Sequence, residues 1–290
     1  LEQLASPMLA AALLTVVSFP VLFLGTVAGF IASALLVVTA RLPARAKAEP
    51  DHFWADVTKG IRIYTRTPRL RGLMVMEAAI AAAGAMVYVN TVVLVQARLG
   101  LGEEAVALAF AGFGAGSMLA AFLLPRILDR LEDRPVMIGG AALMVAGVAL
   151  VPLVGSLAAL IALWAVIGFG FSLTQTPIGR IIKRSAREGD RGAVFAAQFA
   201  LSHACWLVTY PLAGWIGAGA GLSTAAVTLA MIGTAGLAAV WHLWPSNDES
   251  VLPHDHPDLP PGHPHLVEHG EHHTHVVVID DLHRRWPKAA

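Results

Sequence analysis

Several long apolar stretches of this 290-residue sequence contain no lysine or arginine. A basic group at the centre of a bilayer costs about 2.5–3.5 kcal/mol on the helix-insertion scale, so stretches that lack one are suited to hydrocarbon. Charged residues make up only 14% of the chain and hydrophobic residues 56%, a balance that excludes an ordinary soluble globular protein. The sequence therefore predicts a polytopic membrane protein.

Other absences narrow the range of functions. The one cysteine, Cys205, lies in an apolar stretch, which excludes a disulfide framework and a closed thiolate zinc site. A formal net charge of zero gives no indication of nucleic-acid binding. We find no nucleophile–base pair, phosphate-binding loop or membrane zinc motif, so we do not expect an enzyme. The chain starts at Leu1 with an apolar segment that lacks the basic region of a signal peptide, and we expect an N-terminal portion to precede it.

The lengths of the apolar stretches predict an all-α protein with about eight transmembrane helices. About 20 predominantly apolar residues are needed to cross the hydrocarbon core as a helix. Measured against this length, the predicted crossings are residues 4–17, 21–39, 72–96, 104–124, 135–154, 157–179, 193–215 and 222–244.

The loops between these crossings predict the orientation. Sixteen of the twenty lysines and arginines fall in residues 39–71, 125–134 and 180–191, which all face one side of the membrane. Only Arg98 falls on the opposite side. Since cytoplasmic loops carry the excess of basic residues, we expect a multi-pass protein of the inner (plasma) membrane with its C-terminal tail in the cytoplasm.

Two short patterns point to a family. Pro7 and Pro211 each stand inside an apolar helix and are followed by small residues, and they lie six crossings apart, as in two six-helix halves related by a repeat. The short loop of residues 125–134 contains Asp129, Arg130 and Arg134. With the helix count, these features resemble the major facilitator superfamily, in particular its drug- and siderophore-exporter-like branches. The loop departs from the family pattern at Pro125 and Glu132, where the family has glycines.

The resemblance implies a domain organisation. Residues 1–39 would be the last two helices of an N-terminal bundle whose first four transmembrane helices are missing, and residues 72–244 would be the complete C-terminal six-helix bundle. Residues 40–71 would be the cytoplasmic central loop. Its apolar residues recur at helical spacing, which predicts an amphipathic helix that serves as a linker rather than a regulatory site. Residues 245–290 are predicted to be a cytoplasmic, histidine-rich, disordered tail.

The resemblance also implies a transporter that works by alternating access, in which Asp129, Arg130 and Arg134 clamp helix ends on the cytoplasmic face. Glu77 is the one carboxylate in the interior of a predicted crossing, where such a group is costly and often functional, although a structural hydrogen bond is the alternative. Histidine changes charge near neutral pH, so His203 is suited to proton coupling, or is a satisfied core residue. The further candidates for the transport pathway are Tyr88, Asn90, Gln175, Gln198 and Tyr210.

The tail carries the clearest chemical pattern. Imidazole binds Ni, Zn, Cu and Co(II), whereas the prolines among the histidines favour a flexible strip of ligands with modest affinity. A pH-responsive solubilising tail and a segment of no particular use are the alternatives. The expected metal ligands are His254, His256, His263, His265, His269, His272, His273 and His275.

Our leading hypothesis is a proton-coupled secondary exporter, an antiporter, of a divalent metal such as nickel or cobalt. The second hypothesis is an exporter of small amphipathic compounds, with Trp164, Phe169, Phe171 and Trp206 forming an aromatic cavity. The third is a membrane metal buffer or sensor that transports nothing. We expect a monomer whose partners are membrane lipid and a small-molecule or metal-ion substrate, without nucleic acid. No cofactor is expected other than Ni, Co or Zn bound weakly by the tail.

Overall fold

The computed structural model describes residues 9, 13, 16–40, 53–248, 251–255, 260, 262–270, 272–280 and 282–287. Among these residues, seven helices are long and apolar enough to cross a membrane. The predicted crossing at 4–17 falls mostly outside the described residues, and Pro7 falls outside them altogether. The other seven predicted crossings correspond to the seven described helices, with ends that differ by several residues. The prediction of an all-α polytopic membrane protein is confirmed.

The helices follow one another with short connections. The bounds are α2 (Phe19–Thr39), α3 (Phe53–Arg66), α4 (Pro68–Val93), η1 (Leu94–Arg98), α5 (Glu103–Leu128), α6 (Asp133–Leu150), η2 (Val151–Leu153), α7 (Leu157–Gln175), α8 (Ile178–Ser185), η3 (Glu188–Asp190), α9 (Arg191–Ala220) and α10 (Leu222–Leu243). Local chemistry explains several of these ends. Pro68 opens α4, where its missing N–H costs nothing, and the Ser156 hydroxyl caps α7 by accepting from the Ala159 N–H at 3.3 Å. Gly221 joins α9 to α10 at a φ of +89°, which favours glycine.

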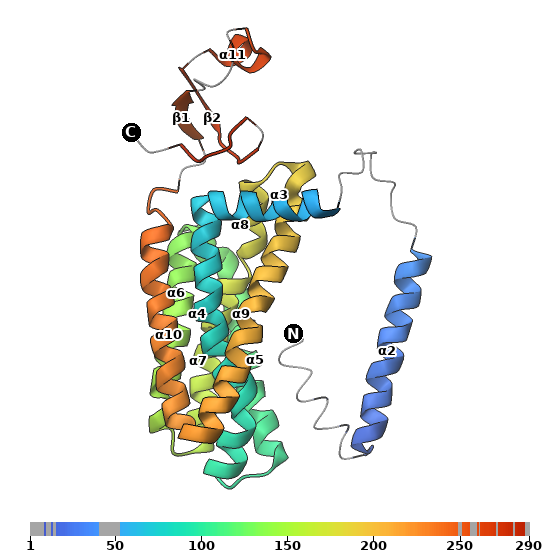
Figure 1. Cartoon of the computed structure of the whole chain (residues 1–290). Helices are drawn as coiled ribbons and strands as arrows, with labels where there is room; N and C mark the ends of the chain where they lie inside the picture. Colours follow the sequence, from blue (N-terminus) through green and yellow to red (C-terminus); the bar gives the residue numbers. More distant parts are fainter. Residues whose placement is uncertain are drawn as a thin grey trace.

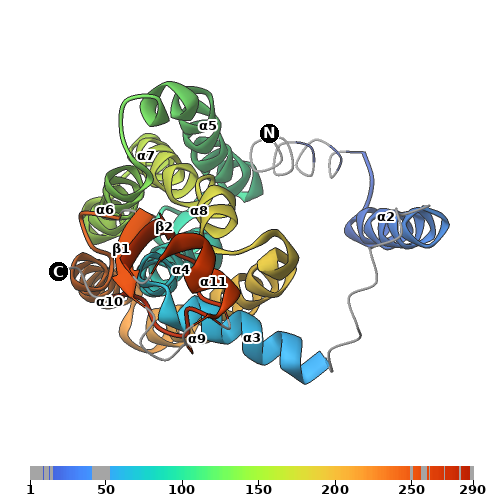
Figure 2. The same ribbon diagram turned by 90° about the horizontal axis from the view of Figure 1, so that it is seen from above.

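The helices α4 to α10 form one bundle, and α2 stands apart from it (Figures 1 and 2). None of the residues of α2 is buried, whereas α4 is the most buried of the seven described spans. In the view from above, α4 lies at the inner side of its neighbours α6, α9 and α10, against which it packs (Figure 2). The core of the bundle is therefore organised around α4.

Small residues allow α5 and α7 to approach closely. A Cβ built on Gly116 would lie 1.8 Å from the carbonyl oxygen of Ala165, and one on Gly168 would lie 1.9 Å from that of Phe113. In lipid, burial of apolar area does not drive helices together, so backbone approach and dispersion carry the association. The glycines at this crossing are therefore required by packing.

The short helix α3 lies across one end of the bundle, beside α8 (Figure 1). Ile63 and Tyr64 are buried against the bundle, and Gly60 meets the backbone of Ala193 on α9 so closely that a Cβ would lie 2.3 Å from its carbonyl oxygen. The amphipathic helix predicted in the central loop is thus present, with part of its apolar side packed on protein. We call this end, where α3, α8 and the tail lie, the tail end.

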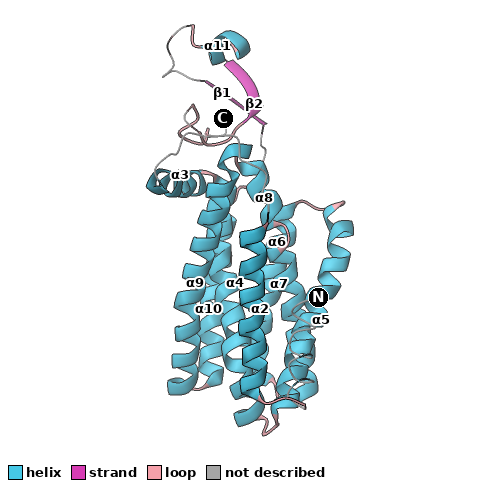
Figure 3. Cartoon of the chain, turned by 90° about the vertical axis from the view of Figure 1, so that its right-hand side faces the viewer, coloured by secondary structure: helices cyan, strands magenta, loops and turns pink. Residues whose placement is uncertain are grey.

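The described part of the tail has regular structure, where the sequence predicts a disordered segment. Strands β1 (Val251–Asp255) and β2 (His272–Val276) pair antiparallel, with Val251 opposite Val276, and α11 (Pro264–His269) lies between them in the chain. The prolines do not prevent this, because Pro253 stands in a two-stranded sheet that consists only of edges and Pro264 occupies the first turn of α11. Figure 3 shows the tail seated over the tail end.

Candidate functional site

Glu77 is buried inside the bundle and is held by two glutamines. Its side chain is 2% exposed. Gln198 on α9 donates from Nε2 to Oε1 of Glu77 at 2.9 Å, and Nε2 of Gln175 on α7 lies 3.5 Å from Oε2, a long contact. The residue is nine positions into α4, about 14 Å from the helix start at 1.5 Å per residue. The structure thus brings three of the predicted pathway residues together, on α4, α7 and α9.

Tyr64 on α3 extends this network to the surface helix. Its hydroxyl donates to Oε1 of Gln198, and its side chain is fully buried. Burial, together with the nearby Glu77 carboxylate, raises the pKa of Tyr64 above its ordinary value, so the phenol stays protonated and remains a donor. We call Tyr64, Glu77, Gln175 and Gln198 the Glu77 network.

A chain of aromatic rings lies farther along the bundle from the tail end than Glu77 and joins α4, α5, α7 and α9. Tyr88 makes edge-on contacts with Phe113 and Trp206 at centroid distances of 5.6 and 5.8 Å. Phe113 continues to Phe171 at 5.6 Å, and Trp206 continues to Tyr210 at 5.1 Å. Edge-to-face ring pairs at these distances are favourable beyond their burial. Of the four residues predicted to form an aromatic cavity, Phe171 and Trp206 belong to this chain.

The other two predicted aromatic residues have packing roles. Trp164 is fully buried and donates from Nε1 to the hydroxyl of Thr91 at 2.8 Å. Phe169 packs on a small apolar cluster that includes Leu124 and Leu173. Asn90 is also turned into the packing between helices, since Nδ2 donates to the carbonyl of Ala213 on α9 at 3.3 Å.

A hollow opens along one side of α9. It has a volume of about 610 Å³, within the range of about 300–1,000 Å³ usual for ligand pockets. Its lining is mainly apolar and aromatic and consists of Ala200, His203, Ala204, Trp206, Leu207, Tyr210 and Pro211. We call this the α9 hollow. Because Trp206 lines it and also touches Tyr88, the hollow and the aromatic chain are continuous.

His203 faces the α9 hollow rather than the Glu77 network. It lies five positions after Gln198, which turns the two side chains about 140° apart on a helix. Its Nδ1 lies 2.7 Å from the carbonyl oxygen of Phe199, one turn earlier, and its ring is exposed. The side chains of His203 and Gln198 therefore point to different sides of α9.

Ion pairs join the helix ends at the tail end. Arg180 of α8 donates from Nε to Asp133 of α6 at 3.0 Å. Asp248, just after α10, pairs with the fully buried Arg69 of α4 at 3.3 Å and with Arg184 of α8. It also accepts a hydrogen bond from the indole N–H of Trp244 at 3.1 Å. Asp248 thus connects α4, α8 and the end of α10.

Of the three residues predicted to clamp the helix ends, Arg134 contacts the end of α10, whereas Asp129 and Arg130 are exposed. Arg134 donates from Nε to the carbonyl of Trp244 at 2.8 Å and lies 5.1 Å from the ring centre of Trp241. Asp129 and Arg130 are exposed and line a polar hollow that also includes Asp248. The carboxylates that hold helix ends here are Asp133 and Asp248, which sequence reasoning missed. Asp133 stands among several charges at the start of α6, and Asp248 follows α10 without a motif around it, so no sequence pattern marks either residue.

The tail is attached to the tail end through Asp280. Its carboxylate pairs with Arg187 at 2.5 Å and with His283 Nδ1 at 3.0 Å. Burial raises the pKa of Asp280, but the hydrogen bonds from His283 and the charge of Arg187 outweigh it and lower the pKa to about 2. Arg66 donates to the carbonyl of Arg284 at 2.6 Å, so the attachment also reaches α3.

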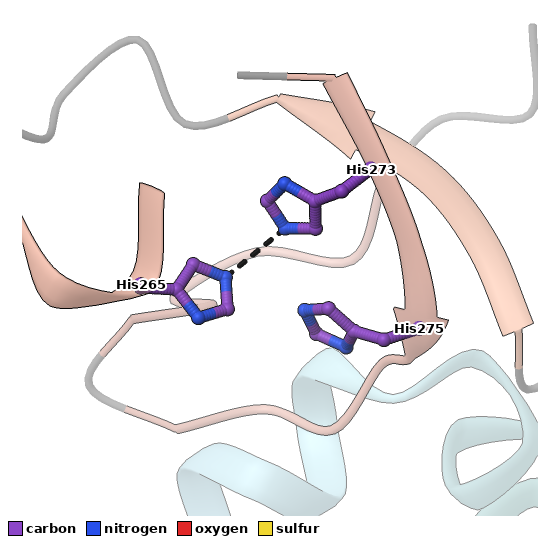
Figure 4. Close-up of side chains that lie close together, drawn as sticks. All are labelled: His265, His273 and His275. Carbon is purple, nitrogen blue, oxygen red and sulfur yellow. Dashed lines mark hydrogen bonds between the residues drawn. The ribbon is translucent and has the colours of Figure 1, made fainter. Parts of the chain in front are cut away.

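The predicted metal ligands fall into three groups. His265, His273 and His275 lie close together (Figure 4). The Nδ1 of His263 accepts from the His265 N–H at 3.3 Å, so it caps α11. The third group consists of candidates whose side chains the structure does not describe: His254, His256, His269 and His272.

Seven helices long and apolar enough to cross a membrane, six of them in one bundle, define a polytopic membrane protein. The family model of the Major Facilitator Superfamily matches residues 73–285. The match spans most of the chain, so this protein belongs to that superfamily. A comparison with curated proteins gives no match. The resemblance drawn from Pro211 and the loop of residues 125–134 is therefore confirmed at the level of the family.

Proposed function

We propose that this protein is a secondary exporter driven by protons, with Glu77 as the group that takes up and releases the proton. The observation that supports this most strongly is the Glu77 network. An ionisable carboxylate inside an apolar bundle is costly, and natural proteins retain it chiefly for function. Gln175 and Gln198 come from two further helices, so a change in the protonation of Glu77 alters contacts between α4, α7 and α9. All three helices belong to the bundle of α4 to α10, so protonation of Glu77 changes the packing within that bundle and favours one of its conformations over another.

The substrate that the α9 hollow fits best is a small amphipathic organic compound. Its lining offers Trp206 and Tyr210 for stacking and cation–π contact, and His203 for one polar contact. In the described spans, no three metal-ligating side chains come together. These features favour the organic substrate over a metal ion in the pathway.

A divalent metal such as nickel is the second candidate substrate, and the histidines of the tail favour it. Under this alternative the tail collects ions at the mouth of the pathway. For either substrate we propose the inner membrane, with the tail end in the cytoplasm, because the basic residues gather there.

Proteoliposomes containing the full-length protein test the proposal. A pH gradient is imposed, and the movement of ethidium, an aromatic cation, and of Ni²⁺ is measured in parallel. We expect gradient-driven movement of ethidium that is lost in Glu77→Gln, while Glu104→Gln, which changes an exposed carboxylate at the start of α5, retains it. Full gradient-driven transport by Glu77→Gln would refute proton coupling at this residue, and movement of Ni²⁺ alone would favour the second candidate.

A further inference from the structure

Three histidines of the tail converge from two elements of its small fold. His265 lies on α11, whereas His273 and His275 lie on β2, two residues apart and hence on one face of the strand. Figure 4 shows the three rings turned toward a common point, with His265 opposite the two strand residues. Within the part of the chain that the structure describes, this is the one group of three or more potential metal ligands.

The spacing of the ring nitrogens matches a metal site. One nitrogen from each of the three rings lies within 4.8 Å of the others, and the Nε2 atoms of His265 and His273 are 3.0 Å apart. Zinc binds imidazole nitrogen at about 2.0–2.1 Å, so two nitrogens of a tetrahedral site lie about 3.3 Å apart. Small rotations of the side chains therefore bring three nitrogens onto one ion.

A further histidine, His283, lies between the three histidines and the bundle and contacts two of their rings. The His283 ring lies 5.0 Å from the His275 ring and 5.8 Å from the His265 ring, between centroids. Its Nδ1 contacts Asp280 at 3.0 Å, and Asp280 in turn pairs with Arg187 in the loop between α8 and α9. Histidines that bind a metal usually donate their other ring N–H to a carboxylate or a backbone carbonyl. Here Nδ1 of His273 lies 2.8 Å from the carbonyl oxygen of Gly270, and Nδ1 of His275 lies 2.9 Å from that of Val276. The cluster is thus connected to the transport bundle through His283 and Asp280.

The donor set restricts the ion. Three neutral imidazoles suit zinc, nickel, cobalt(II) and copper(II), and they are poor ligands for magnesium and calcium, which prefer oxygen. A site with three protein ligands leaves a position for water or for a further donor.

We propose that His265, His273 and His275 form a site for one divalent transition-metal ion, which fastens α11 to β2 on the tail end of the bundle. The site is part of the folded tail and differs from a flexible strip in which all the histidines act alike. It does not depend on which substrate the bundle carries.

Equilibrium dialysis of the full-length protein in detergent, against Zn²⁺ and Co²⁺, tests the site. We expect one tightly bound ion per chain, and visible absorption of the Co²⁺ form typical of a site with fewer than six ligands. Changing even a neighbouring group that orients a ligand typically weakens metal binding about 10–100-fold. The variant His265→Asn, His273→Asn, His275→Asn should therefore lose more than about 100-fold in affinity.

The matched control removes the other candidate ligands, by changing His254, His256, His269 and His272 to Asn. The proposal predicts that this control keeps the tight ion, whereas a flexible strip predicts that both variants lose affinity to a similar extent. Retention of the tight ion by the triple variant would overturn the proposal.

X-ray absorption of the zinc-loaded wild-type protein gives a test that needs no variant. Three imidazoles in the first shell are expected, and one or none would overturn the assignment. None of these measurements involves transport, so failure of the metal site and failure of the proposed transport function are distinguishable.

Discussion

Asp248→Asn tests how the tail end holds the bundle together. Asp248 accepts from Trp244 and pairs with Arg69 and Arg184. The side chain of Arg69 is 0% exposed and that of Asp248 is 8% exposed, whereas Arg184 is 37% exposed. The substitution therefore leaves one fully buried guanidinium beside a neutral amide.

The expected loss of stability follows from the burial of the Arg69–Asp248 ion pair. Removal of one partner of a buried ion pair costs about 3–5 kcal/mol, because the other charge stays in low dielectric. We expect the lower end, about 3 kcal/mol, since the amide oxygen still accepts from Trp244 and since water screens Arg184. For a chain of this size about 1 kcal/mol moves the unfolding midpoint by about 2–4 °C, so the expected fall is roughly 6–12 °C.

Thermal unfolding of the purified protein in detergent, followed by intrinsic tryptophan fluorescence, measures the effect. Asp129→Asn is the matched control, because Asp129 lines the same polar hollow but is exposed, and it should cost less than about 0.5 kcal/mol. Adding Arg69→Met to Asp248→Asn removes the buried guanidinium as well and should recover part of the loss. Equal effects of the two aspartate substitutions, or no recovery, would refute the reasoning.

Three further predictions concern the helix crossing, the Glu77 network and the tail. Gly116→Ala should destabilise the protein by at least about 1–3 kcal/mol in the same unfolding assay, because its Cβ meets backbone, whereas Gly139→Ala, with open space around it, should not. Tyr64→Phe should cost about 1–2 kcal/mol and alter the pH profile of transport, since Gln198 loses its donor; an unchanged profile would contradict the network. Chelation of bound zinc should lower the unfolding temperature of the wild type and leave that of the triple histidine variant unchanged. With zinc at 100 times its Kd before chelation, the free energy of unfolding of the wild type should fall by about 2.7 kcal/mol.

The features that could be predicted from sequence are those that a single helix carries by itself. Each membrane span is recognisable because its length and its lack of charge are properties of consecutive residues. Glu77 stands out for the same reason, as a carboxylate in an apolar run. The family followed from short motifs around Pro211 and Arg134, although the sequence did not show which charges act as clamps.

The features that sequence reasoning missed are relations between distant residues. Tyr64 reads as one apolar residue of an amphipathic helix, and only its contact with Gln198, 134 positions later, places it beside Glu77. Asp248 reads as an ordinary residue after a helix, and its importance depends on the burial of Arg69. The periodicity of α9 was sufficient to separate His203 from Gln198, but the direction that each faces depends on the packing of α4.

The sequence by itself determined the membrane spans, the family and the presence of a lone carboxylate within the bundle, because hydrophobicity and charge act locally along the chain. Only the tertiary structure decided that glutamines from two other helices hold Glu77, that Asp248 joins the helix ends, and that three of the tail histidines meet. The physical reason is that hydrogen bonds, ion pairs and metal sites depend on distances across the fold, which residue order alone does not specify.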